Sequence, residues 1–130
     1  MPHWTLRDIS RDAAAAAMRM PVATLDVWLH RYKAPSGKWK GARVFSAQDV
    51  VTLQTARRLL SPGILASRAL EIAGRHLADP PDYAATLYVT EAGDFIAGPD
   101  DWPECDFTCV HIGWIAHDIL KRLEADIVAL

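Results

Sequence analysis

The sequence predicts an α+β fold, with helices in the first half of the chain and a small β-β-β-α element in the second. Apolar residues recur at helical spacing as far as residue 77, whereas short β-branched and aromatic runs separated by turn residues begin at residue 86. The 130 residues are enough for about one domain, at roughly 100–200 residues per domain. With 51% hydrophobic and 23% charged residues, the composition is typical of a globular protein and argues against global disorder.

The first two predicted helices lie close together in the sequence. Residues 8–18 contain five consecutive alanines, which have the highest helix propensity. Pro21 suits the first turn of a second helix that extends to about Tyr32, because the N–H that proline lacks is unsatisfied at that position. Only Arg19 and Met20 separate the two helices, and so tight a turn is typical of a helix-turn-helix unit.

The segment from Lys33 to Phe45 predicts a short hairpin, because proline and glycine residues exclude a regular helix. At or near its tip we expect Lys38, Trp39, Lys40 and Arg43. Ser46 and Asp49 then form an approximate capping box, which predicts a helix to about Leu60. A further helix is expected from about Ile64 to Leu77, so the order of elements is that of a winged helix-turn-helix.

The segment Asp79–Asp82 contains two prolines and marks a boundary. It divides the chain into residues 1–78, the winged part, and residues 79–130, a small acidic element for dimerisation or partner binding. Within the second part we expect strands and then a helix, at residues 86–90, 94–98, 107–112 and 114–127.

The last predicted helix carries an apolar stripe with spacings of four and three residues. The stripe consists of Ala116, Leu120, Leu123, Ile127 and Leu130. A heptad pattern of this kind is adequate for a dimer contact, and the first four residues are therefore candidates for homodimerisation. The alternative is that the stripe covers the three-stranded sheet of its own chain, and the pattern is equally consistent with both.

The charges are distributed very unevenly between the two parts. The net charge is −2, but residues 1–76 carry 12 Lys and Arg against 5 Asp and Glu, a balance of +7. Residues 77–130 carry 2 Lys and Arg against 11 Asp and Glu, a balance of −9. Such an asymmetry suggests a nucleic-acid-binding part joined to a part with a different role.

Two stretches, residues 13–28 and 41–53, resemble the DNA-binding domain of MerR-like regulators. The positions typical of that family are occupied here by Thr24, Leu25, Trp28, Gly41, Arg43, Phe45, Ser46, Asp49 and Val50. The resemblance covers about residues 9–77 and implies a bacterial-type transcription regulator that binds double-stranded DNA as a dimer. Arg19 stands where the family usually has a glycine, and Asp26 where an arginine commonly follows the Thr-Leu pair.

If the chain binds DNA, two groups of residues are expected to contact it. The start of a recognition helix reads base edges in the major groove, here through Pro21, Ala23, Thr24 and Val27. These offer one hydroxyl and some apolar surface, so sequence reading should be modest. Phosphate neutralisation is expected from Arg31, Lys33, Lys38, Lys40 and Arg43, with Trp39 against a sugar or in the minor groove. Asp26 would be repelled by DNA unless it accepts from a cytosine or pairs with a neighbour such as Arg31.

Other function classes have less support in the sequence. Cys105, Cys109 and His111 resemble half of a zinc site, but residues four apart in a strand are about 13 Å from each other, so we expect no metal and no cofactor. No glycine-rich phosphate loop or catalytic arrangement is present, and an enzyme that uses the acidic loop 99–106 ranks last. Two alternatives remain: a protein-interaction adaptor or antagonist acting through the acidic half, and an excisionase-like protein that bends DNA. Without an apolar run of about 20 residues or a secretion signal, we expect a cytoplasmic protein.

Overall fold

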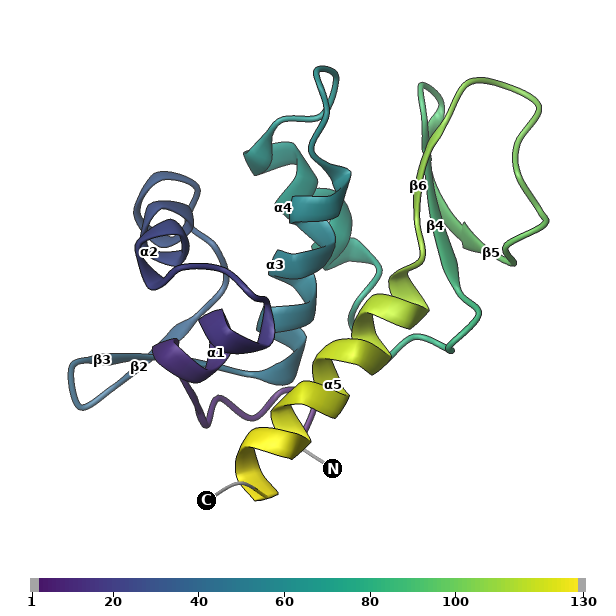
Figure 1. Cartoon of the computed structure of the whole chain (residues 1–130). Coiled ribbons are helices and arrows are strands. Elements are labelled where there is room, and N and C mark those ends of the chain that lie inside the picture. Colours follow the sequence, from purple (N-terminus) through teal and green to yellow (C-terminus); the bar gives the residue numbers. More distant parts are fainter. Residues whose placement is uncertain (1–2, 129–130) are drawn as a thin grey trace.

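The computed structural model describes residues 3–128, and the side chains of residues 3–125. Within that range it has five helices and two three-stranded antiparallel sheets (Figure 1). In chain order the elements are β1 (Ile9–Ser10), α1 (Arg11–Ala17), α2 (Val22–Arg31), β2 (Gly37–Trp39), β3 (Ala42–Phe45), α3 (Ala47–Leu59), α4 (Ala66–Arg75), β4 (Thr86–Thr90), β5 (Gly93–Ala97), β6 (Thr108–Val110) and α5 (Ile112–Val128). The predicted mixture of helices and strands is confirmed.

The turn between α1 and α2 is closed by backbone hydrogen bonds. The N–H of Arg19 donates to the carbonyl of Ala16, and the N–H of Met20 donates to that of Ala15, both over 3.0 Å. This pattern is a Schellman motif, which requires a left-handed residue after the helix end. Arg19 is that residue, with φ of 53°, so the predicted break between the helices is confirmed.

The first helix is shorter than predicted. It begins at Arg11 rather than at residue 8, because Ile9 and Ser10 pair with Phe45 and Val44 to form β1. The hydroxyl of Ser10 then caps α1 by accepting a hydrogen bond from the N–H of Ala13. The two-residue strand thus holds the start of α1 against the hairpin.

The predicted hairpin is formed by β2 and β3, with β3 in the centre of the first sheet. Trp39 pairs with Ala42 across a two-residue turn, and the turn residues Lys40 and Gly41 have φ of 49° and 81°. Two consecutive residues with positive φ are typical of a type I′ turn, whose twist matches that of the strands.

The capping box at the start of α3 is confirmed. The hydroxyl of Ser46 accepts from the N–H of Asp49, and the carboxylate of Asp49 accepts from the N–H of Ser46. The carboxylate, which is buried, also accepts hydrogen bonds from Nε and Nη2 of Arg7 over 2.8 and 3.3 Å. The hydrogen bond to Asp49 raises the pKa of Arg7, although partial burial opposes it.

The second sheet has the order β5-β4-β6, and every residue of the central strand β4 is buried. Leu87 and Val89 belong to the main core. Tyr88 lies outside that core: it stacks on Phe95, meets Phe107 edge-on, and donates its hydroxyl to the carbonyl of Gly98. Residues from β5 and from the loop before β6 therefore cover one face of this strand.

Helix α5 joins the two halves of the chain. It runs diagonally beside α1, α3 and β4, and contacts all three (Figure 1). Leu53 of α3, Leu87 of β4 and Ile119 of α5 belong to one continuous hydrophobic core. The boundary expected at residues 79–82 falls in the loop between α4 and β4, and the core continues across it. No helix among residues 3–128 is long and apolar enough to cross a membrane.

Candidate nucleic-acid interface

Helix α2 is anchored by one face and exposes the other. Leu25, Trp28 and Leu29 are buried and hold the helix against the core. Three of the four residues expected to read bases are exposed, namely Pro21, Ala23 and Val27. The fourth, Thr24, is half-buried and lines a cavity together with Trp28. The exposed start of this helix is therefore mostly apolar.

The carboxylate of Asp26 has a partner within the chain. Nη1 of Arg11, at the start of α1, lies 3.2 Å from Oδ1 of Asp26. Asp26 thus pairs with a neighbouring cation as expected, but the partner is Arg11 of the adjacent helix and not Arg31 of α2 itself. Pairing with Arg11 offsets the negative charge that Asp26 places on α2.

The hairpin carries three exposed side chains next to one another, Lys38, Trp39 and Lys40. Nζ of Lys40 lies 5.7 Å from the centroid of the Trp39 ring, a cation–π contact. Lys38 lies directly opposite Arg43 in the strand pairing. Like charges in that position destabilise a sheet, so an anion bound beside the hairpin would relieve the repulsion.

The remaining expected phosphate contacts lie near the end of α2. Arg31 is the last residue of the helix, and Lys33 follows it with φ of 55°; both side chains are exposed. Arg43 is half-buried and donates to the hydroxyl of Ser36 over 3.1 Å. Arg43 is thus held in place by a hydrogen bond to a neutral neighbour.

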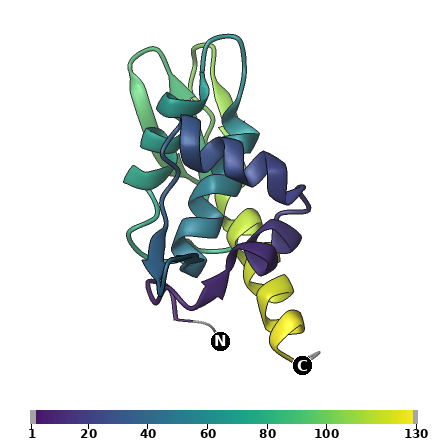
Figure 2. The same cartoon turned by 90° about the vertical axis from the view of Figure 1, so that its left-hand side faces the viewer.

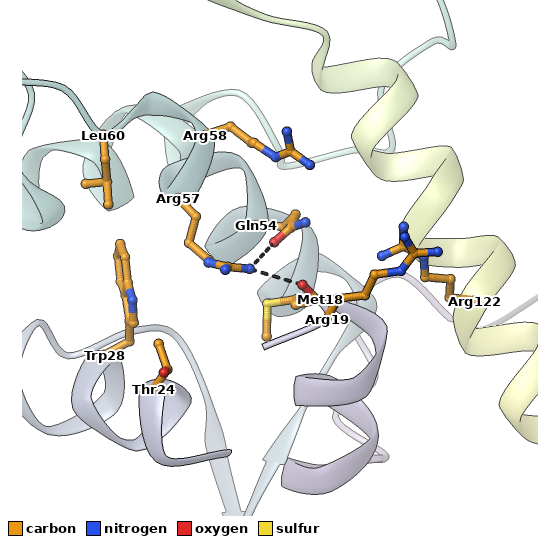
Figure 3. A pocket seen from close by; sticks show the side chains of 9 residues that line it. All are labelled: Met18, Arg19, Thr24, Trp28, Gln54, Arg57, Arg58, Leu60 and Arg122. Carbon is orange, nitrogen blue, oxygen red and sulfur yellow. Dashed lines mark hydrogen bonds between the residues drawn. The ribbon is translucent and has the colours of Figure 1, made fainter. Parts of the chain in front are cut away.

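Two arginines close the turn between α1 and α2. Nη1 of Arg57 donates to the carbonyl of Met18 over 3.1 Å and to Oε1 of Gln54 over 2.8 Å (Figure 3). Nη1 of Arg122 donates to the carbonyl of Ala17 over 2.7 Å. Cations at the end of a helix are stabilising because the unpaired carbonyls carry partial negative charge. Helices α3 and α5 therefore both hold the turn that leads into α2.

The comparisons with known proteins address this part of the chain. Residues 9–71 match the family described as MerR HTH family regulatory protein, from β1 to within α4. The match covers just under half of the chain and identifies these residues as similar to a MerR-type helix-turn-helix domain. This similarity suggests a DNA-binding transcription regulator. Neither the curated proteins nor the solved structures gave a match to the chain.

The residues expected to form a dimer contact lie beyond the region that matches the family, on α5. Ala116, Leu120 and Leu123 are only 1%, 8% and 3% exposed, because α5 packs them inside its own chain. The fourth, Ile127, lies outside the described side chains. Since α5 contacts α1, α3 and β4, the three described stripe residues face the interior of their own chain, which includes more than the sheet considered in the alternative.

The cysteines also lie beyond the region that matches the family, and both are exposed: Cys105 in the loop before β6, and Cys109 within β6. Nδ1 of His111 lies 3.5 Å from the hydroxyl of Thr86. Among the described residues, no three or more His, Cys, Asp or Glu side chains are grouped so that they could hold a metal ion.

Proposed function

We propose that this chain is a MerR-like transcription regulator that binds double-stranded DNA in a sequence-dependent manner. In this proposal α2 enters the major groove and the β2–β3 hairpin acts as a wing on the phosphates. The observation that carries it is that α2 and a cationic hairpin are both exposed on the same side of the molecule (Figure 2). A groove-reading helix flanked by a basic hairpin suits a duplex, because phosphates border the groove.

Phosphate binding would come from five cations, Arg31, Lys33, Lys38, Lys40 and Arg43. The like charges of Lys38 and Arg43, opposite each other in the hairpin, support it because a phosphate would neutralise both. Five contacts predict a slope of about −4.5 in a plot of log affinity against log salt, at −0.9 per contact.

Base reading would be weak and mostly apolar. Val27 is 48% exposed, and Ala23, one turn before it, is exposed on the same face of α2, whereas Pro21 is exposed at the N-cap. Apolar side chains of this kind distinguish base pairs mainly through contact with thymine methyl groups in the major groove. We therefore expect a moderate preference for sites with thymines at those positions, superimposed on strong binding to any duplex at low salt.

The test is a titration of a fluorescent pool of random duplex DNA with the full chain at two salt concentrations. The variant Lys38→Ala/Lys40→Ala/Arg43→Ala should bind much more weakly. A matched control, Arg68→Ala/Lys121→Ala, removes exposed cations of α4 and α5 and should bind nearly as well as the parent chain. Losses in proportion to the number of charges removed, three against two, would mean that binding follows net charge and not the hairpin.

We further propose that the chain acts as a homodimer, which would place two α2 helices on half-sites of a pseudo-palindrome, about 34 Å apart. Because Ala116, Leu120 and Leu123 are buried, the contact would use the exposed side of α5. Trp114 is 45% exposed there, and Tyr83 beside it is 59% exposed and meets His117 edge-on. Light scattering at micromolar concentration should give twice the chain mass, and Trp114→Glu should give a folded monomer. A monomeric parent chain would refute this part.

A second candidate function is binding of a basic protein partner through the loop 99–106. Its acidic side chains are exposed, and Trp102 in the middle of the loop is 63% exposed. The mostly apolar start of α2 also fits this alternative, since it offers no cation to a duplex. Absence of DNA binding at low salt would favour it over the DNA-binding proposal.

A further inference from the structure

A cavity of about 520 Å³ lies between α2, α3 and α5 (Figure 3). Its lining includes two apolar side chains and four cations, namely Trp28, Leu60, Arg19, Arg57, Arg58 and Arg122. Its volume falls within the range of small-molecule sites, about 300–1,000 Å³. Four of the nine lining residues are arginines, an unusual concentration of cations around one hollow.

The cavity has an apolar side and a cationic side. The indole of Trp28 and the side chain of Leu60 lie on one side, whereas Arg58, Arg19 and Arg122 lie across from them (Figure 3). Arg57 extends between the two (Figure 3). Leu60 is 46% exposed, so its apolar surface is accessible from the cavity mouth. A molecule that fits this hollow would be apolar at one end and anionic at the other.

Most of the positive charge in the cavity is not matched by a carboxylate. Arg122 pairs with Asp118 over 2.6 Å, but Arg57 donates to neutral oxygens. Among the described residues, neither Arg19 nor Arg58 forms an ion pair. Burial and the charge of Arg58 lower the pKa of Arg57, as expected for cations that repel each other. An anion in the cavity would compensate three guanidinium groups.

We propose that this cavity binds a small organic anion, an aromatic or other planar body that carries a carboxylate or a phosphate. The body would pack on Trp28 and Leu60, and the anionic group would accept hydrogen bonds from the guanidinium groups of Arg58 and Arg19. Arginine favours carboxylate and phosphate because its planar fork presents paired donors to them. The site lies inside the helix-turn-helix region, and its occupation does not require DNA.

Occupation of the cavity would also affect the turn that leads into α2. Arg57 and Arg122 line the cavity and at the same time hold the carbonyls of Met18 and Ala17. An anion that draws these guanidinium groups toward itself competes with the two carbonyls. Ligand and DNA would then change each other's affinity by the same factor, since such coupling is reciprocal. This consequence rests on the proposed DNA binding, whereas the binding site itself does not.

The test uses two probes on the full chain without DNA, phenyl phosphate and inorganic phosphate, with titration calorimetry as the readout. Phenyl phosphate should bind about tenfold more tightly, because only its ring reaches the apolar side. Arg58→Gln should weaken phenyl phosphate binding about tenfold, through loss of a charge-assisted contact at an exposed position that the fold does not require. Arg68→Gln on α4, also exposed, is the matched control and should leave binding unchanged.

Two results would overturn the proposal. One is equal affinity for both probes, and the other is binding that Arg58→Gln leaves unchanged. If phenyl phosphate binds no better than inorganic phosphate while Arg58→Gln flattens the salt dependence of DNA binding, the cavity is a DNA phosphate contact and not a ligand site. Failure of DNA binding with intact phenyl phosphate binding would refute the proposed function alone.

Discussion

Arg122 offers a direct test of the contact between α5 and the turn before α2. Its Nη1 donates to the carbonyl of Ala17 over 2.7 Å, and its side chain is 23% exposed. Arg122→Met retains the apolar stem but removes the donors. A hydrogen bond from a charged group contributes about 1.5–3 kcal/mol, and the lower end applies because water still reaches the side chain. The i,i+4 pair with Asp118 adds only a few tenths. We expect the free energy of unfolding to fall by about 1.5 kcal/mol.

Urea denaturation followed by far-ultraviolet circular dichroism measures this loss. Lys121→Met, at the neighbouring exposed position, is the matched control and should change the free energy of unfolding by less than about 0.5 kcal/mol. If Arg122→Met destabilises the chain no more than the control does, Arg122 does not hold the turn. Helix α5 would then not stabilise the turn between α1 and α2 through this residue.

Three further changes test other parts of the structure. Arg19→Gly should increase the free energy of unfolding by about 0.5–1 kcal/mol and so raise the thermal midpoint, because glycine adopts the left-handed conformation without strain. A lower midpoint would contradict the Schellman turn. Gly113→Ala should lower the free energy of unfolding, measured in urea, by more than about 2 kcal/mol, because the added methyl would collide with the backbone carbonyls of residues 82 and 83. A decrease of less than about 0.5 kcal/mol would mean that residues 82 and 83 do not pack on α5. Although burial alone would raise the pKa of Asp94, hydrogen bonds from Arg75 and His76 hold it below its ordinary value. The stabilisation from Asp94 is therefore complete above the unfolded-state pKa of about 3.9 and is lost as the pH falls through the lower native pKa. In Asp94→Asn the free energy of unfolding should therefore fall less steeply with decreasing pH in the acid range. An unchanged pH dependence would show that Asp94 does not contribute in this way.

The features that the sequence predicted well are those fixed by neighbouring residues. The capping box of Ser46 and Asp49, the break at Arg19 and the turn at Gly41 each depend on residues within a few positions. The helix propensity of the alanine run likewise predicted α1, and Ala14 and Ala15 are buried where α1 meets its neighbouring helices. Helix caps, helix breaks and tight turns can therefore be predicted from the sequence alone.

The features that the sequence missed depend on contacts between distant residues. Arg57 and Arg122 donate to backbone carbonyls 39 and 105 residues away. Because every residue has a backbone carbonyl, these acceptors cannot be recognised from the residue type. The partner of Asp26 comes from α1, which only the packing of α1 against α2 reveals. The stripe on α5 has the same spacing whether it faces another chain or its own core, and Leu120 shows the latter. The arginine cavity likewise exists only once three helices are brought together.

Binding of DNA phosphates by the hairpin should appear in the salt dependence of the affinity for DNA. Binding of a random duplex is measured across a series of salt concentrations for the parent chain and for Lys38→Ala/Lys40→Ala/Arg43→Ala. We expect the slope of log affinity against log salt to be flatter in the triple variant by about 2.7, at −0.9 per lost contact. Equal slopes for the two proteins, or no binding by the parent chain at the lowest salt, would show that the hairpin does not bind phosphates.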